Sequence, residues 1–131
     1  MELRSVEELM DLLYACRHQR ALRTAALLRR SRPADKELQV AGLVHDIGQL
    51  LGPAEETARA DRAAQAVRPL LGERVHHLVR HHGPTTDEDL LRLREAVEES
   101  GSAGFDAGVL EDWRAVLELV AARNSRLETV D

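Results

Sequence analysis

Residues 35–52 read DKELQVAGLVHDIGQLLG and form the longest run of closely spaced apolar residues in the sequence's first half. Its apolar residues recur at helical spacing, but they occupy more faces than a surface helix would show. They are Leu38, Ala41, Leu43, Val44, Ile47 and Leu50. The stretch therefore predicts a helix at the centre of the molecule, ended by Gly52 and Pro53.

The composition excludes a β-rich fold. The chain has 131 residues, of which 44% are hydrophobic, but it contains a single Phe, a single Tyr and a single Trp. Strands favour aromatic and β-branched residues, and a chain of this length suffices for one core but not for two. We therefore expect an all-α fold, a single bundle of about six to seven helices over residues 1–131.

Further helices are predicted around the central one. Ser5 and Glu8 form a capping box ahead of the first helix, and Thr86 is the expected cap of the sixth. Pro33 is expected to end the second helix and Pro69 the fourth. The small-residue stretch SGSAG is expected to link the sixth helix to the last. The expected ranges are 6–16, 21–30, 57–68, 73–82, 87–99 and 106–123.

Charge and cysteine content exclude several classes of function. The formal net charge is −5 at pH 7, so we expect no nucleic acid and no membrane as a partner. Cys16 is the sole cysteine, which excludes an internal disulfide. The first residues are acidic where a secretion signal would be basic, and no apolar run approaches the ~20 residues that span a bilayer. These features predict a cytoplasmic protein.

His45 and Asp46 are the first candidates for chemistry. A buried carboxylate beside an imidazole is costly unless a cation, a metal ion or several hydrogen bonds compensate for its burial. The pair therefore predicts either a metal site or a buried His–Asp hydrogen bond that fixes the helix. The dipeptide alone does not decide between the two.

A second group of histidines lies in VHHLVRHH, residues 75–82. On a helix, His82 falls on the same stripe as the apolar residues before it, so we expect it to face the core as a second candidate ligand. His77 and His81 are expected to point outward, with His76 between the two faces. Exposed imidazoles suit the C-terminal end of a helix dipole.

Three stretches together resemble a known family. They are ALRTAALL at 21–28, DKELQVAGLVHDIGQLLG at 35–52 and AAQAVRPLLGERVHHLVRHH at 63–82. Over about residues 15–83 the chain resembles the HD-domain superfamily. Within that superfamily it is most similar to small HD-domain oxygenases that cleave phosphonates with a mixed-valent diiron centre, relatives of myo-inositol oxygenase. The resemblance implies an all-α HD-domain bundle.

The resemblance also implies a set of metal ligands, which this sequence matches in part. His45, Asp46 and His82 stand at the positions of the HD pair and of a later His ligand. Arg20 and Arg59 stand where two further His ligands would be, and no residue corresponds to the late Asp of the family. We therefore expect no two-metal centre. The two guanidinium groups would instead neutralise Asp46.

Two functions are open at this point. In the first, an HD-superfamily enzyme or former enzyme binds a small anionic molecule, of the phosphonate, phosphate or carboxylate type, between the substrate-binding residues Arg20 and Arg59. The catalytic residues would be His45, Asp46 and His82. These three would act either without a metal or as the ligands of a single divalent metal ion, with iron among the candidates.

In the second possible function, the domain is a non-catalytic interaction or accessory protein. Its former metal site has become a buried salt-bridge network. It would act as a homodimer or as the partner of another enzyme. The two functions differ in structure. An open pocket of about 300 Å³ or more would favour a ligand site, whereas pairing of Arg20 and Arg59 with Asp46, without a cavity, would favour the second.

Overall fold

Seven α-helices and two short 3-10 helices, without a strand, form the part of the chain that the computed structural model describes, residues 2–15, 18–51, 55–81, 85–102 and 106–129. The all-α prediction is therefore confirmed. In chain order the elements are α1 (Val6–Ala15), α2 (Gln19–Ser31), α3 (Lys36–Val44), η1 (Ile47–Leu51), α4 (Glu56–Leu71), α5 (Glu73–Arg80), α6 (Glu88–Ser102), η2 (Leu110–Trp113) and α7 (Arg114–Thr129).

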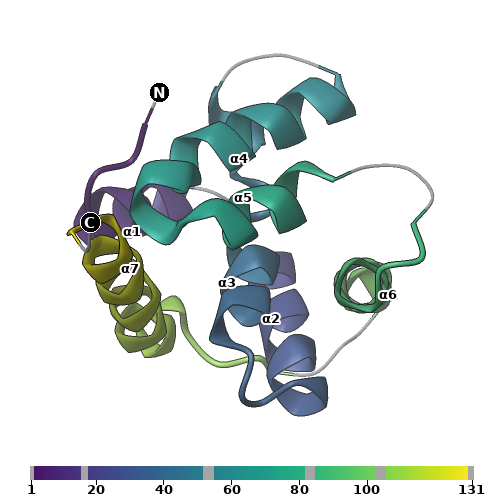
Figure 1. The fold of residues 1–131 in the computed structure, drawn as a ribbon. Coiled ribbons are helices and arrows are strands. Elements are labelled where there is room, and N and C mark those ends of the chain that lie inside the picture. Colours follow the sequence, from purple (N-terminus) through teal and green to yellow (C-terminus); the bar gives the residue numbers. More distant parts are fainter. Residues whose placement is uncertain (1, 16–17, 52–54, 82–84, 103–105, 130–131) are drawn as a thin grey trace.

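Helix α3 lies at the centre, as its apolar pattern predicts. Every residue from Leu38 to Val44 is buried, and the helix packs against α2, α5, α6 and α7 (Figure 1). Asp35 caps its start by accepting a hydrogen bond from the Leu38 backbone N–H at 3.1 Å. The helix is shorter than expected, because it ends at Val44 and a turn leads into η1. The HD pair therefore follows the helix rather than lying in its middle.

Helices α4 and α5 form a hairpin around Gly72. This glycine has a φ of +97°, a conformation that L side chains rarely adopt. Pro69 lies inside the last turn of α4 and does not end the helix, contrary to the prediction. Asn124 of α7 donates its Nδ2–H to the Pro69 carbonyl oxygen at 2.9 Å. This contact satisfies a carbonyl that the helix end leaves without an intrahelical partner.

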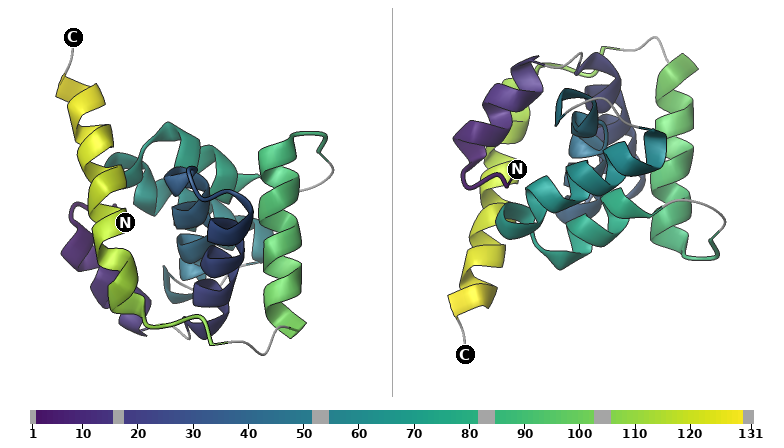
Figure 2. Two further views of the ribbon diagram at one scale, coloured as in Figure 1. Left: turned by 90° about the horizontal axis from the view of Figure 1, so that it is seen from below. Right: turned by 90° about the horizontal axis from the view of Figure 1, so that it is seen from above.

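Helices α6 and α7 lie on opposite sides of α2 and α3 (Figure 2). Trp113, the last residue of η2, is buried and carries the Arg29 guanidinium over its ring, 4.1 Å from the centroid. Asp87, not Thr86, caps α6, since its carboxylate accepts from the backbone N–H groups of Asp89 and Leu90. The start of the expected SGSAG linker, residues 100–102, is helical.

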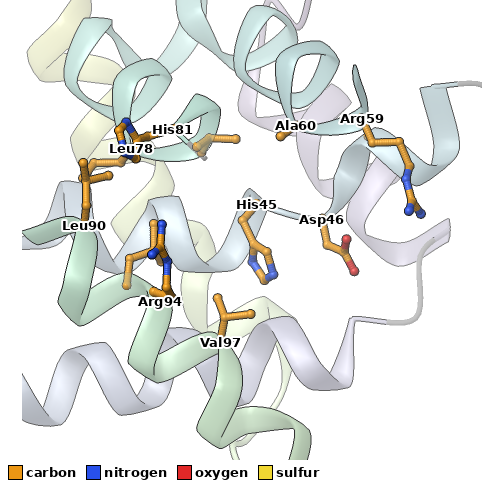
Figure 3. Close-up of a pocket in the computed structure, with 12 residues that line it drawn as sticks. His45, Asp46, Arg59, Ala60, Leu78, His81, Leu90, Arg94 and Val97 are labelled. Atoms are coloured by element: carbon orange, nitrogen blue, oxygen red, sulfur yellow. The ribbon is translucent and has the colours of Figure 1, made fainter. Parts of the chain in front are cut away.

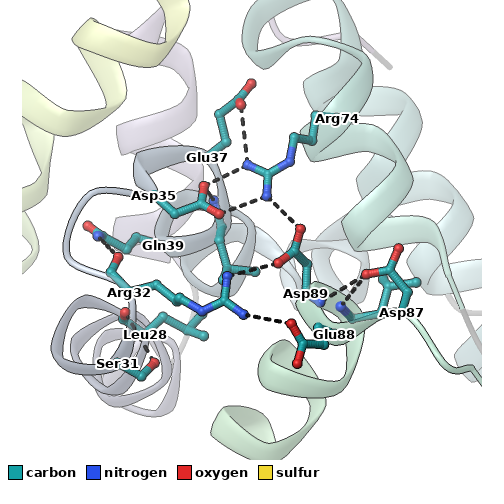
Figure 4. Close-up of polar contacts among 12 residues, drawn as sticks. Leu28, Ser31, Arg32, Asp35, Glu37, Gln39, Arg74, Asp87, Glu88 and Asp89 are labelled. Atoms are coloured by element: carbon teal, nitrogen blue, oxygen red, sulfur yellow. Dashed lines mark hydrogen bonds and ion pairs between the residues drawn. The ribbon is translucent and has the colours of Figure 1, made fainter.

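Two sets of contacts hold α6 in place. At its C-terminal end, the Arg20 guanidinium donates to the Val97 carbonyl oxygen at 3.0 Å and to Ser100 Oγ at 3.3 Å. At its N-terminal end, Asp89 accepts from both Arg32 and Arg74, at 3.0 Å each (Figure 4). The helix is thereby fixed to α2 at one end and to α2 and α5 at the other.

Among the described residues, no helix is both long enough and apolar enough to cross a membrane.

Candidate functional site

A cavity of about 230 Å³ opens where the end of α3 and η1 meet α4, α5 and α6 (Figure 3). Its walls carry the HD pair, two arginines, one further histidine and a group of apolar side chains. The lining residues are His45, Asp46, Gly48, Arg59, Ala60, Leu78, Val79, His81, Leu90, Leu93, Arg94 and Val97. Charged and apolar side chains therefore line the same cavity. Its volume is below the roughly 300 Å³ expected of a ligand site.

His45 has a fixed ring orientation at this cavity. It is half-buried at the C-terminal end of α3, and its Nδ1 lies 2.7 Å from the Gly42 carbonyl oxygen. Because a carbonyl oxygen can only accept, Nδ1 carries the proton and Nε2 keeps its lone pair in the neutral ring. Burial lowers the pKa of His45, although the Gly42 hydrogen bond and the Asp46 charge oppose this shift. The imidazole is thus held in the neutral form that can accept a proton or a hydrogen bond.

Asp46 is exposed at the edge of the cavity, so the expectation of a buried carboxylate is wrong. The turn after Val44 accounts for the difference, because a helical projection of the HD pair does not apply beyond the end of α3. Asp46 lies on the same side of His45 as Arg59 (Figure 3). If Asp46 belongs to a salt-bridge network, as the second function expects, its carboxylate is exposed rather than buried.

Two arginines line the cavity, Arg59 from α4 and Arg94 from α6. Both are half-buried. Arg59 Nε is fully buried and has no hydrogen-bond partner among the residues that the structure describes. A buried guanidinium N–H without an acceptor is costly, so a ligand oxygen that reached this atom would be stabilised.

Arg20 lies outside the cavity lining. Its guanidinium binds the C-terminal part of α6 instead, through Val97 and Ser100. The predicted juxtaposition of Arg20 and Arg59 at one cavity is therefore not what the structure shows. Arg94, which the sequence analysis did not single out, takes the place of the second cavity arginine.

The histidines of α5 differ from the prediction in one respect. His81 was expected to point outward, but it lines the cavity with Nε2 buried and without a hydrogen-bond partner within the described ranges. The helix ends at Arg80, and His81 has extended backbone angles (φ −66°, ψ 131°), so its direction does not follow the helical period. His77 is exposed, as predicted, and His76 is buried. His82 lies outside the described residues, so its predicted role stays a prediction.

Gly48 is required by the close approach of η1 to α4. A Cβ atom at this position would lie 2.0 Å from the carbonyl oxygen of Arg59. Because backbone atoms of a helix cannot move aside, no other residue fits without shifting the elements apart. Gly48 therefore sets the position of the Arg59 backbone at the wall of the cavity.

The donor set at the cavity was tested against the metal that the resemblance implies. The described residues contain no group of three or more His, Cys, Asp or Glu side chains that could hold a metal ion. Two guanidinium groups in the same wall add positive charge, which disfavours a cation. The described residues therefore do not fit a metal. A single ion held by His45, Asp46 and His82 stays a prediction, since His82 is outside the described part of the chain.

No protein-family model matches the chain, and no curated protein and no solved structure matches it. The resemblance to the HD-domain superfamily accordingly stays a prediction.

Proposed function

We propose that this chain is a metal-independent relative of HD-domain proteins that binds a small organic anion in the cavity beside His45. The observation that carries the proposal is the buried Nε of Arg59, which has no hydrogen-bond partner among the described residues. An anionic oxygen at that position would form a charge-assisted hydrogen bond with it.

The charge of the cavity wall supports an anion. Arg59 and Arg94 contribute two positive charges, while Asp46, which is exposed to solvent, contributes one negative charge. Solvent screening weakens the effect of an exposed carboxylate. The half-buried guanidinium groups therefore dominate the potential inside the cavity.

The size and polarity of the cavity indicate an organic rather than an inorganic anion. A volume of 230 Å³ corresponds to about eight water molecules at about 30 Å³ each. Apolar side chains contributed by α5 and α6 make up a large part of the wall, and such side chains favour a carbon skeleton over a hydrated ion. They are Leu78, Val79, Leu90, Leu93 and Val97.

The same site can take part in proton transfer. The hydrogen bond from Nδ1 of His45 to Gly42 leaves Nε2 as the proton acceptor. With the pKa of His45 lowered by burial, the ring is neutral near pH 7. We therefore extend the proposal to His45 as a general base, whose Nε2 takes the proton of a hydroxyl group on the ligand and returns it when the reaction is complete. The accessory-protein alternative stays a prediction, although Asp46 is exposed and Arg20 binds α6.

Titration with simple anions tests the proposal. We expect butyrate, methylphosphonate or succinate to shift the backbone amide NMR signals of residues around the cavity, with a saturable dependence on concentration. Arg59→Met should weaken the binding at least about tenfold, because it removes a charge-assisted hydrogen bond. Arg62→Met is the matched control, since Arg62 is exposed on the same helix and does not line the cavity.

Dialysis against EDTA tests the metal-independent part separately. Binding should be unchanged after the treatment. Saturable binding that disappears with EDTA and returns with a divalent metal would overturn the metal-independent part while leaving the cavity as the binding site. Absence of binding by every anion tested would overturn the whole proposal.

A further inference from the structure

We infer that the ligand is an organic dianion that carries one acidic group at each end of a short apolar spacer. This inference rests on the proposed function, since it specifies the class of anion that the same cavity takes. The structural basis is the placement of Arg59 and Arg94 at opposite ends of the cavity, with the His45 ring between them (Figure 3).

The two ends of the cavity differ in their surroundings. Asp46 and Arg59 lie on one side of His45, whereas Arg94, His81 and the apolar residues Leu78 and Leu90 lie on the other side (Figure 3). The two arginines therefore approach the cavity from different sides of the His45 ring (Figure 3). A ligand with two separated acidic groups can engage both at once.

Contacts outside the cavity hold the backbone segments that carry the two arginines. The backbone of Arg59 lies against η1, where Gly48 leaves no room for a Cβ atom. Helix α6, which carries Arg94, is held at one end by Arg20 and at the other by the ion pairs of Asp89 (Figure 4). Fixed charges of this kind select ligands by the distance between their acidic groups.

The wall between the arginines suits an apolar spacer. Leu93 and Val97 of α6 and Ala60 of α4 line the cavity and offer no hydrogen-bonding side chain. Methylene groups are stabilised when they replace water against such a surface. A cavity of 230 Å³ holds a molecule of roughly the volume of eight waters, which leaves room for two acidic groups and a few carbon atoms.

The charges are consistent with a dianion. Each guanidinium group has several N–H donors, so a ligand with two acidic groups can form a charge-assisted hydrogen bond with each arginine. Asp46 repels the acidic group at the Arg59 end, but its exposure to water reduces that repulsion. His81 adds its buried Nε2 at the Arg94 end, where it has no other hydrogen-bond partner among the described residues.

The test compares succinate with butyrate, which has the same number of carbon atoms but one acidic group. Succinate should bind at least about tenfold more tightly by calorimetry at low ionic strength. In the series oxalate, succinate and suberate, the affinity should be highest for the intermediate length. Inorganic phosphate, whose charges lie on one group, should bind more weakly than succinate.

Two variants assign the preference to the arginines. Arg59→Met and Arg94→Met should each reduce the ratio of succinate to butyrate affinity to within about twofold of one. Arg62→Met on α4 and Arg92→Met on α6 are the matched controls and should keep the wild-type ratio, since neither residue lines the cavity. Circular dichroism of each variant verifies that it is folded.

The outcomes separate this inference from the function on which it rests. Equal affinity for butyrate and succinate, or no dependence on chain length, would overturn the dianion while leaving anion binding intact. A succinate preference that persists in both arginine variants would also overturn it. Absence of binding by all the anions would instead overturn the proposed function itself.

Discussion

Nδ1 of His45 donates a hydrogen bond to the carbonyl oxygen of Gly42, 2.7 Å away, one helical turn earlier in the chain. The contact is local to the end of α3, so it forms whenever the helix forms. It satisfies a carbonyl group that lies near the helix end, and it fixes both the tautomer and the direction of the ring. The neutral His45 ring at the cavity therefore has its lone pair on Nε2, where it can accept a hydrogen bond or a proton.

The first prediction concerns the protonation state of His45. At pH 7 its ring should be neutral, with the proton on Nδ1, because burial lowers its pKa and the Gly42 carbonyl accepts from Nδ1. Two-bond nitrogen–proton correlation NMR distinguishes the two nitrogens directly. The midpoint of its titration should lie below about 6.5, the value of an unperturbed histidine. A protonated Nε2 at pH 7 would contradict the prediction.

The second prediction is a loss of stability in mild acid. Burial lowers the pKa of both His45 and His76, and the Arg68 charge adds to the effect at His76. In the unfolded chain both rings titrate near 6.5, so below that pH the unfolded state binds more protons than the folded state. The free energy of unfolding therefore falls as the pH drops from about 6.5 towards the folded pKa values.

Urea denaturation between pH 7.5 and 5.5 measures this effect. The midpoint should decrease over the interval in the wild type and less so in the double variant His45→Gln, His76→Gln. His77→Gln is the control, because His77 is exposed and should keep the wild-type pH dependence. A midpoint that stays constant or rises in acid would show that neither ring is held neutral.

The third prediction concerns Asp35, which both caps α3 and pairs with Arg74. Its two carboxylate oxygens lie 2.6 and 2.7 Å from the Arg74 guanidinium nitrogens (Figure 4). Asp35→Ala removes the cap and the ion pair and should cost about 2 kcal/mol of unfolding free energy, of which the cap accounts for about 1 kcal/mol. Asp35→Asn keeps a capping oxygen and should cost about half as much.

Acid titration provides an independent measurement at the same pair. The Arg74 hydrogen bond lowers the pKa of Asp35 below its ordinary 3.8. The pair therefore contributes stability above about pH 4 that is lost as the pH falls through the lower, folded pKa. Arg74→Met should raise the pKa of Asp35, observable by carboxyl-carbon NMR. An unchanged pKa would show that Arg74 does not bind the carboxylate in solution.

The helices themselves were predictable, but several of their ends were not. Periodic apolar residues located the seven helices because amphipathic burial drives helix formation in a folded protein. The end of α3 at Val44 depends on how η1 meets α4, a contact that lies outside the local sequence. The sequence predicts a helix end at Pro69, but α4 continues to Leu71, and Asn124 of α7 donates to the Pro69 carbonyl oxygen, a contact that the local sequence does not indicate.

The fourth prediction tests that contact between η1 and α4. Gly48→Ala would place a Cβ atom against the Arg59 carbonyl oxygen, and the resulting overpacking should cost about 1–3 kcal/mol. Gly101→Ala is the control, since its Cβ would meet the flexible guanidinium end of Arg20 at 3.3 Å. That variant should change stability by less than about 1 kcal/mol. Similar melting temperatures for the two variants would show that η1 does not approach α4 closely.

The cavity was predicted in part. His45 and Arg59 were named from the sequence, and both line it. Arg94 had a signal that could have been used, because it lies four residues after Leu90 and three before Val97 on the apolar stripe of α6. His81 had none, since its direction depends on where α5 ends. A helical projection fails beyond the last helical residue, and helix ends are the least certain part of a sequence-based prediction.

The last prediction follows from that difference between the histidines of α5. His81 lines the cavity, so His81→Ala should weaken succinate binding about two- to tenfold, the effect of one hydrogen bond of about 0.5–1.5 kcal/mol. His77→Ala, one helical turn earlier and exposed, should leave the affinity unchanged. The centroids of the two rings lie only 6.0 Å apart. A difference between the two substitutions would therefore come from the direction in which each ring points, not from its position along the chain. Equal effects of the two substitutions would mean that the His81 ring does not face the ligand, and His82→Ala would then test the residue that the sequence pattern favours.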